Sequence, residues 1–283
     1  MADRASSNTA VGVAWLRAAH QILDDAPRIL DDPAIVALLG PDTEVAVQRA
    51  AADYGQPVAR ALRAHVVVRT RYAEERLEDA VRRGVRQYVV LGAGLDTFAY
   101  RQPAWASLLE VFEVDQPATQ HAKLERLRTS GIVPPANVKF VAIDFEHEPL
   151  GDGLSRGGLR GDTPTFFSWL GVTMYLSKQA IDAVFRTVVG FPRGSEIVFT
   201  FATPIDATNP QERGRALLAA RAAEAGEPWI TFYEPMHLAA ELKRLGFSDV
   251  RFLTPAETAE RYFEGRRDGL PAPRHLSIAV ASV

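Results

Sequence analysis

The chain has 283 residues, of which 47% are hydrophobic and 24% are charged, values ordinary for a soluble globular protein. Its formal net charge of −3, with no block of basic residues, excludes the electrostatic footprint that binding to a phosphate backbone requires. The absence of cysteine excludes disulfides, thiolate metal sites and a cysteine nucleophile, and it is consistent with a reducing cytosol.

Targeting and membrane signals are also missing from the sequence. Residues 1–7 contain no apolar segment of the kind found in signal peptides, and no run of about 18 apolar residues occurs. We therefore expect a cytoplasmic protein, a monomer or homodimer, with no bound metal and with neither nucleic acid nor membrane as a partner.

The first 85 residues predict an N-terminal helical cap. Apolar residues recur there at helical spacing, and prolines divide the segment into several helices. The apolar positions are Val11, Ala14, Trp15, Ala18 and Ile22, and the prolines are Pro27, Pro33, Pro41 and Pro57.

From Gln87 onward, short β-branched runs alternate with helical stretches. This alternation is typical of a doubly wound α/β fold, a parallel sheet with helices on both faces. The predicted strands are residues 88–91, 109–114, 139–143, 165–169 and 196–201, and the clearest predicted helices are residues 119–128 and 178–189.

The last third of the chain predicts a lid and two closing strands. An alanine-rich helix over residues 210–224 leads to the aromatic segment 229–235, and together they form a lid insert at about residues 205–235. A helix over residues 236–245 follows, and strands at 250–253 and 276–281 suit an antiparallel edge. We expect residues 86–283 to form the core, within one structural domain overall.

A Gly-Ala-Gly turn follows the strand that ends at Leu91. Gly92 and Gly94 can adopt positive φ and, together with Ala93, let the backbone approach a ligand closely. A dinucleotide-binding loop would carry a third glycine at position 97, where this chain has Thr97. The loop therefore disfavours NAD and suits a ligand without phosphates.

Acidic residues follow the next two strands. Asp115 is placed to accept hydrogen bonds from both ribose hydroxyls. Asp144 is placed to accept from an adenine amine while Phe145 packs on the ring, although Asp144 also suits a helix N-cap. Asp96 has the same two interpretations, ligand contact or helix cap, and ranks below Asp115.

The sequence resembles the leucine carboxyl methyltransferase family and its bacterial branch of S-adenosylmethionine-dependent methyltransferases. The resemblance lies in residues 69–72 (RTRY), 87–101 (QYVVLGAGLDTFAYR), 112–117 (FEVDQP) and 171–176 (GVTMYL). It implies a class I methyltransferase fold, a Rossmann-like sheet of seven mostly parallel strands whose final strand is antiparallel.

The resemblance also implies roles for individual residues. It implies S-adenosylmethionine as cofactor and S-adenosylhomocysteine as product, with Asp115 on the ribose and Asp144 and Phe145 at the adenine. Arg69 would bind the methionine carboxylate, for which a bidentate guanidinium is well suited, and Arg17 would be a second cationic anchor.

One position departs from the family pattern. Members that act on protein tails carry a glutamate where this chain has Leu170. We therefore expect an O-methyltransferase of secondary metabolism that acts on a carboxylate or hydroxyl of a small molecule. Methylation of a protein C-terminal carboxylate and a non-catalytic nucleoside-binding module are the alternatives.

Two residues, Tyr175 and His237, are candidates for a catalytic role. Tyr175 follows the fourth strand and is placed to orient an acceptor, although a core tyrosine fits the pattern equally well. His237, beside the predicted lid, is the best placed of the six histidines, with an ordinary helix histidine as the alternative. Trp229, Phe232 and Tyr233 either wall the acceptor site or close the core.

Overall fold

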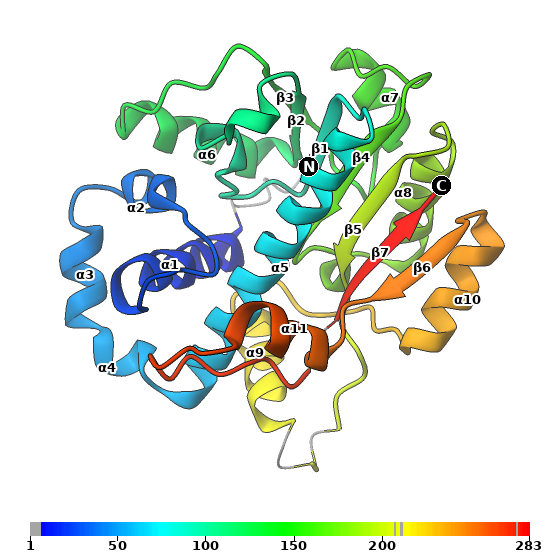
Figure 1. The fold of residues 1–283 in the computed structure, drawn as a ribbon. Helices are drawn as coiled ribbons and strands as arrows, with labels where there is room; N and C mark the ends of the chain where they lie inside the picture. Colours follow the sequence, from blue (N-terminus) through cyan, green and yellow to red (C-terminus); the bar gives the residue numbers. More distant parts are fainter. Residues whose placement is uncertain (1–6, 207, 210–211, 276) are drawn as a thin grey trace.

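The computed structural model describes residues 7–206, 208–209, 212–275 and 277–283. Its centre is a seven-stranded sheet with the strand order β3-β2-β1-β4-β5-β7-β6 (Figure 1). The strands are β1 Gln87–Leu91, β2 Glu110–Asp115, β3 Val138–Ala142, β4 Thr165–Trp169, β5 Glu196–Thr200, β6 Asp249–Phe252 and β7 Ile278–Ser282. The five predicted parallel strands are therefore confirmed.

The sheet is parallel except at β7, which pairs antiparallel with both β5 and β6. The predicted antiparallel end of the sheet is thus confirmed, with β6 rather than β7 at the edge. Leu276, the predicted start of the last strand, lies outside the described residues.

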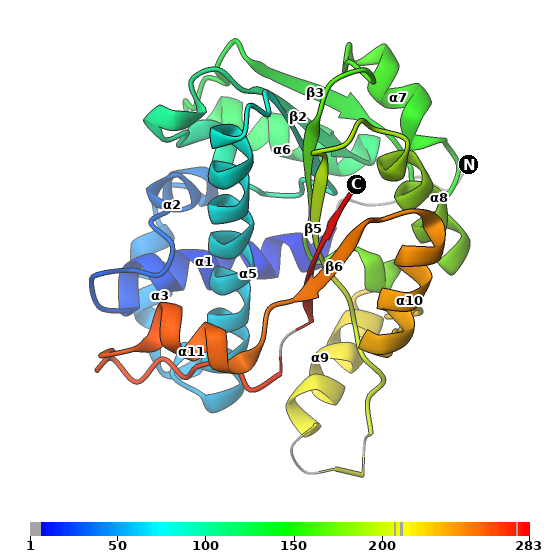
Figure 2. The same cartoon turned by 45° about the vertical axis from the view of Figure 1, so that its right-hand side comes forward.

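Helices cover both faces because the side chains of buried strands alternate between the faces. Val89 and Leu91 of β1 point to one face, and Tyr88 and Val90 point to the other. Figure 2 shows α5 on one side of the sheet and α8 and α10 on the other. The helices over the sheet are α5 Pro57–Arg82, α6 Pro117–Thr129, α7 Leu150–Arg156, α8 Lys178–Val189 and α10 Pro235–Leu245.

The segment between β1 and β2 differs from the expected alternation. It contains two short 3-10 helices, η1 Phe98–Tyr100 and η2 Ala104–Ala106, where a full helix was expected. Asp96 consequently caps a turn: its Oδ1 accepts a hydrogen bond from the Phe98 N–H at 2.9 Å.

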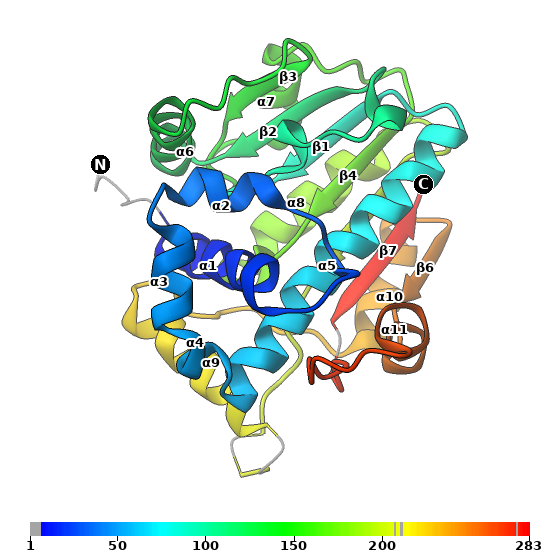
Figure 3. The same ribbon diagram turned by 60° about the vertical axis from the view of Figure 1, so that its left-hand side comes forward.

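The N-terminal helices lie to one side of α5 at the carboxyl edge of the parallel strands, and the longest of them packs against it (Figure 3). Pro33 and Pro57 are at the first turns of α2 and α5, where the missing N–H costs no helical hydrogen bond. These helices are α1 Asn8–Leu23, α2 Pro33–Leu39, α3 Thr43–Arg49 and α4 Ala51–Tyr54.

Two helices remain, α9 Arg213–Glu224 in the predicted lid and α11 Pro255–Phe263 beyond β6. Pro210 and Gln211, the predicted start of the lid helix, lie outside the described residues. Among the helices of the described ranges, none is both apolar enough and long enough to cross a bilayer.

Candidate active site

The glycine loop after β1 forms the floor of a cavity at the carboxyl edge of the sheet. Gly92 and Gly94 have φ values of +64° and +46°, a conformation that side chains disfavour. A Cβ on Gly92 would lie 2.4 Å from Cγ2 of Val172, so this position has room for glycine alone. The N–H of Ala93 donates to the carbonyl of Val114 at 2.9 Å, which holds the loop against β2.

Asp115 at the end of β2 lies beside this loop. Its Oδ2 accepts from the Gly94 N–H at 2.5 Å and its Oδ1 accepts from the Gln116 N–H at 2.7 Å. Burial raises the pKa of this carboxyl group, and the two backbone hydrogen bonds oppose that shift. A carboxylate has about four lone-pair positions, so Asp115 retains acceptor capacity towards the cavity.

Asp144 and Phe145 follow β3 and also line the cavity. Asp144 Oδ1 accepts from the backbone N–H of Glu146 at 3.0 Å, and Oδ2 contacts the ring Nδ1 of exposed His147 at 3.0 Å. No α-helix begins at this position, since α7 starts at Leu150. Asp144 therefore stabilises a turn, with its carboxylate among the lining groups.

Arg69 on α5 is a buried cation that lines the cavity. Its guanidinium forms no hydrogen bond or ion pair within the described part of the chain, and its Nε is fully buried. Burial, with a further contribution from Arg17, lowers its pKa to about 10, so it remains charged at neutral pH. A Cβ on Gly171, whose φ is +78°, would lie 2.7 Å from the Arg69 Nη1 atom.

Arg17 lines the same cavity, but its guanidinium already has partners. Its Nε donates to Asp32 Oδ2 at 3.0 Å, Nη1 donates to the Leu95 carbonyl at 2.9 Å, and Nη2 donates to Thr97 Oγ1 at 2.5 Å. Thr97, the residue in place of a third glycine, donates in turn to Asp32 Oδ1 at 2.6 Å. The structure thus places Arg17 as a support of the glycine loop.

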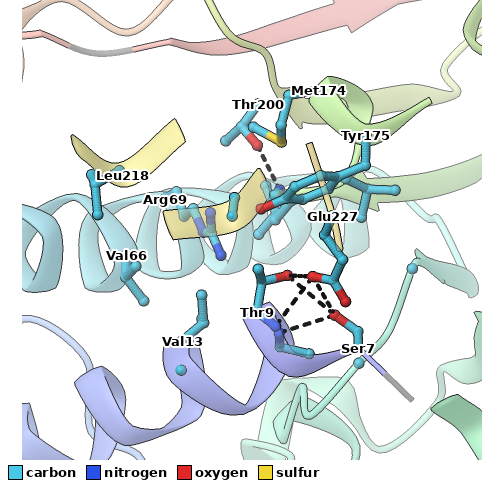
Figure 4. Close-up of a pocket in the computed structure, with 18 of the residues that line it drawn as sticks. Ser7, Thr9, Val13, Val66, Arg69, Met174, Tyr175, Thr200, Leu218 and Glu227 are labelled. Atoms are coloured by element: carbon cyan, nitrogen blue, oxygen red, sulfur yellow. Dashed lines mark hydrogen bonds between the residues drawn. The ribbon is translucent and has the colours of Figure 1, made fainter. Parts of the chain in front are cut away.

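The two catalytic candidates are in different places. Tyr175 lines the cavity, and its ring and Arg69 extend into the same part of it (Figure 4). Its hydroxyl forms no hydrogen bond with a described residue. His237 is exposed on α10 and is absent from the cavity lining, so the structure does not bring it to the other candidates.

The cavity has a volume of about 1390 Å³. One ligand of ordinary size occupies a pocket of about 300–1,000 Å³, so this cavity has room for a cofactor and an acceptor together. Trp229 and Leu170 are part of its wall, whereas Phe232 and Tyr233 are not. The lid thus contributes one of its three aromatic candidates.

The lining also includes His65 and Glu227, which were not among the predicted site residues. His65 lies four positions before Arg69 on α5, a spacing that places both on one helix face and that was visible in the sequence. Glu227 follows α9 and binds the first turn of α1, more than 200 residues away in the chain. No local pattern signals a contact of that kind.

The sheet order, with the glycine loop after β1 and the acid after β2, is that of the class I methyltransferase fold. Solved structures share this fold. A duf574 family protein from Streptomyces avermitilis matches with a TM-score of 0.55 at 18% identity, covering 98% of this chain and 97% of that chain. A "putative methyltransferase" from Thermobifida fusca matches with a TM-score of 0.56 at 19% identity, covering 87% and 91%.

Sequence comparison gives the family. The family model described as "Leucine carboxyl methyltransferase" matches residues 10–189. The Bacillus subtilis protein named "Putative S-adenosyl-L-methionine-dependent methyltransferase YktD" is 35% identical over 212 residues, which cover 73% of this chain and 68% of that protein. A Mycobacterium marinum protein with the same general description is 33% identical over 238 residues, covering 81% and 74%.

The chain belongs to the leucine carboxyl methyltransferase family, as the sequence motifs predicted. It is an S-adenosylmethionine-dependent methyltransferase.

Proposed function

We propose that this enzyme is an O-methyltransferase that methylates a carboxylate or hydroxyl group of a small molecule. The proposal includes the cytoplasmic location, the role in secondary metabolism and the monomeric or dimeric state expected from the sequence. The observation that carries it is the large cavity, which extends from the glycine loop past Arg69 to the lid.

The residues present fit the cofactor. Arg69 is a buried cation without a partner among the described residues, which suits the methionine carboxylate. The glycine cradle leaves space that a Cβ would fill at Gly92, and Asp115 lies beside it to accept from the ribose hydroxyls. Asp144 and Phe145 would contact the adenine, and Ala93 and Asp96 of the loop line the same cavity.

The bound cofactor would supply a methyl group on a sulfonium. The protein then has to hold an acceptor oxygen in line with that group and exclude water, and no covalent enzyme intermediate is needed. Tyr175 would orient the acceptor from the end of β4, and Trp229 lines the cavity beside it, because the next residue, Ile230, donates its N–H to the Met174 carbonyl at 2.8 Å. The apolar Leu170 in the lining supports a small molecule rather than a protein tail.

The test is a transfer assay with methyl-labelled cofactor against a panel of aromatic acids and phenols. The expected result is transfer to at least one small acceptor, identified by mass spectrometry. Labelling confined to the C-terminal carboxylate of proteins would contradict the proposal. Cofactor binding by calorimetry, with no transfer to any member of either group, would favour a nucleoside-binding module.

A further inference from the structure

The imidazole of His65 lines the cavity one helical turn from Arg69 on α5. It is partly buried, and neither ring nitrogen has a hydrogen-bond partner in the ranges that the structure describes. A polar ring held inside a cavity without a protein partner is available to a ligand.

His65 lies in the part of the cavity that we assign to the methyl acceptor. The first half of α5 lies beside α9 there: a Cβ on Gly214 would be 3.7 Å from Cγ2 of Val58. Both helices also contribute apolar side chains to the lining. They are Leu62 and Val66 from α5 and Leu218 and Ala222 from α9.

Two charged groups act on the ring, Arg69 from its own helix and Arg215 from α9. Burial is the largest cause, and with these two cations it lowers the pKa of His65 to about 3. The imidazole is therefore neutral at physiological pH, with one nitrogen that donates and one that accepts.

The neutral ring of His65 can accept a hydrogen bond, whereas Arg215 and Trp229 of the same lining can only donate. Arg215 is a donor that already binds Glu212 Oε2 at 2.5 Å and the carbonyl and hydroxyl of Thr203, each at 2.6 Å. The Trp229 indole can only donate, and its buried N–H has no partner in the described residues.

This set of groups suits a hydroxyl better than a carboxylate. The hydroxyl group of a ligand can donate a hydrogen bond to the neutral imidazole and can also accept one. The ring nitrogen and the hydroxyl oxygen are then both satisfied. A carboxylate has no proton to donate to the ring, and the two cations that act on His65 are engaged elsewhere: Arg215 is paired with Glu212, and Arg69 would be paired with the carboxylate of the cofactor.

We propose that His65 is an acceptor-binding residue of this enzyme and accepts a hydrogen bond from the hydroxyl group of an apolar alcohol or phenol. This inference rests on the proposed O-methyltransferase function and selects one of its two acceptor classes. The apolar part of the acceptor packs between Leu62 and Leu218, against Trp229.

Calorimetry on the full chain saturated with S-adenosylhomocysteine tests the proposal. The probes are 2-naphthol and 2-naphthoate, which share one apolar body and differ in the polar group. The variants are His65→Phe, which removes the hydrogen bond, and His65→Gln, which restores an acceptor. His121→Gln, an exposed histidine on α6, is the matched control.

We expect native protein to bind the naphthol more tightly than the naphthoate. His65→Phe should weaken naphthol binding about tenfold, which corresponds to the loss of one hydrogen bond. His65→Gln should recover part of this loss, and His121→Gln should bind as native does. Because His65 is not among the residues proposed to bind the cofactor, all variants should retain their affinity for S-adenosylhomocysteine.

Tighter binding of the naphthoate, no binding of the naphthol, or a naphthol affinity unchanged in His65→Phe would overturn the inference. These outcomes leave the proposed function intact, because a carboxylate acceptor remains open. Failure of native protein to bind S-adenosylhomocysteine would instead remove the function on which the inference rests.

Discussion

The carboxylate of Glu227 accepts hydrogen bonds from the backbone N–H groups of Asn8 at 3.0 Å and Thr9 at 3.2 Å. It also accepts from the hydroxyl of Ser7 at 3.2 Å and from that of Thr9 (Figure 4). The segment after α9 therefore caps the first turn of α1, where N–H groups lack helical partners and a negative charge is favourable. This contact joins two walls of the cavity.

Glu227→Ala should loosen the wall that contains α9. Loss of a helix cap costs about 0.5–2 kcal/mol, so we expect faster tryptic cleavage at Arg221 and weaker retention of S-adenosylhomocysteine. Time-resolved proteolysis and calorimetry measure these effects. Glu224→Ala, at an exposed position of the same helix, should behave as native. Equal cleavage of both variants would show that the Glu227 contact does not hold the wall.

Arg17→Met should destabilise the protein even without cofactor. The Asp32 side chain is fully buried, and Arg101 also contacts it at 3.1 Å, so the variant leaves a buried carboxylate with fewer partners. Removal of one member of a buried ion pair costs about 3–5 kcal/mol. Urea unfolding of cofactor-free protein measures this loss, with the exposed Arg49→Met on α3 as control.

The opposite result would restore the ligand role predicted for Arg17 from the sequence. In that case Arg17→Met would leave the unfolding free energy unchanged and weaken only cofactor binding.

Gly171→Ala should impair cofactor binding through Arg69. The added Cβ would lie 2.7 Å from Arg69 Nη1 and displace the guanidinium. Gly158→Ala is the matched control, because its φ of +83° imposes similar backbone strain while its nearest neighbour, Lys139 Nζ, is 3.5 Å away. Both variants should lose about 1–3 kcal/mol of stability, but only Gly171→Ala should lose affinity for S-adenosylhomocysteine. Equal affinities would argue against Arg69 as the carboxylate anchor.

Asp115→Ala should weaken cofactor binding by roughly 1–3 kcal/mol, the cost of leaving buried polar partners unsatisfied. Calorimetry with S-adenosylmethionine measures the change. Asp162→Ala, whose side chain is 75% exposed, is a suitable control. An unchanged affinity would remove Asp115 from the ribose site.

Much of the fold was predictable because its signals are local. The strand at residues 165–169 was predicted with the bounds that the structure gives, because an apolar β-branched or aromatic run between turns has few alternatives. The region after β1 was not predictable in this way. Its helix is replaced by short turns whose hydrogen bonds depend on Asp96 and on the distant Asp32.

The part of the site that lies at the ends of the strands was predictable, because the order of the strands in the chain decides where these residues lie. Residues that follow consecutive parallel strands meet at one edge of the sheet, so Gly92, Asp115 and Asp144 line one cavity. The direction of a side chain on a helix depends instead on how the helix is rotated about its axis and how it packs on the sheet. His237 was favoured for its place beside the lid, but α10 turns it to solvent, whereas α5 turns His65 inward.

The pH dependence of stability gives an independent test of the His65 environment. The pKa of this ring is lowered from 6.5 to about 3 by burial and by Arg69 and Arg215, so between these values the unfolded chain binds a proton that the folded chain does not. Stability therefore falls as pH decreases below about 6.5, by up to roughly 1.4 kcal/mol per pH unit from this group.

Native protein should accordingly lose more unfolding free energy than His65→Gln between about pH 7.5 and pH 5, by up to roughly 2 kcal/mol. Urea denaturation at the two pH values measures the difference, and His121→Gln should lose as much as native protein. If native and His65→Gln lost the same amount, the ring would be titrating as a solvent-exposed histidine. A solvated imidazole would not be held neutral at this site. It would then not be held as the acceptor of the hydrogen bond that we propose from the hydroxyl group of the substrate.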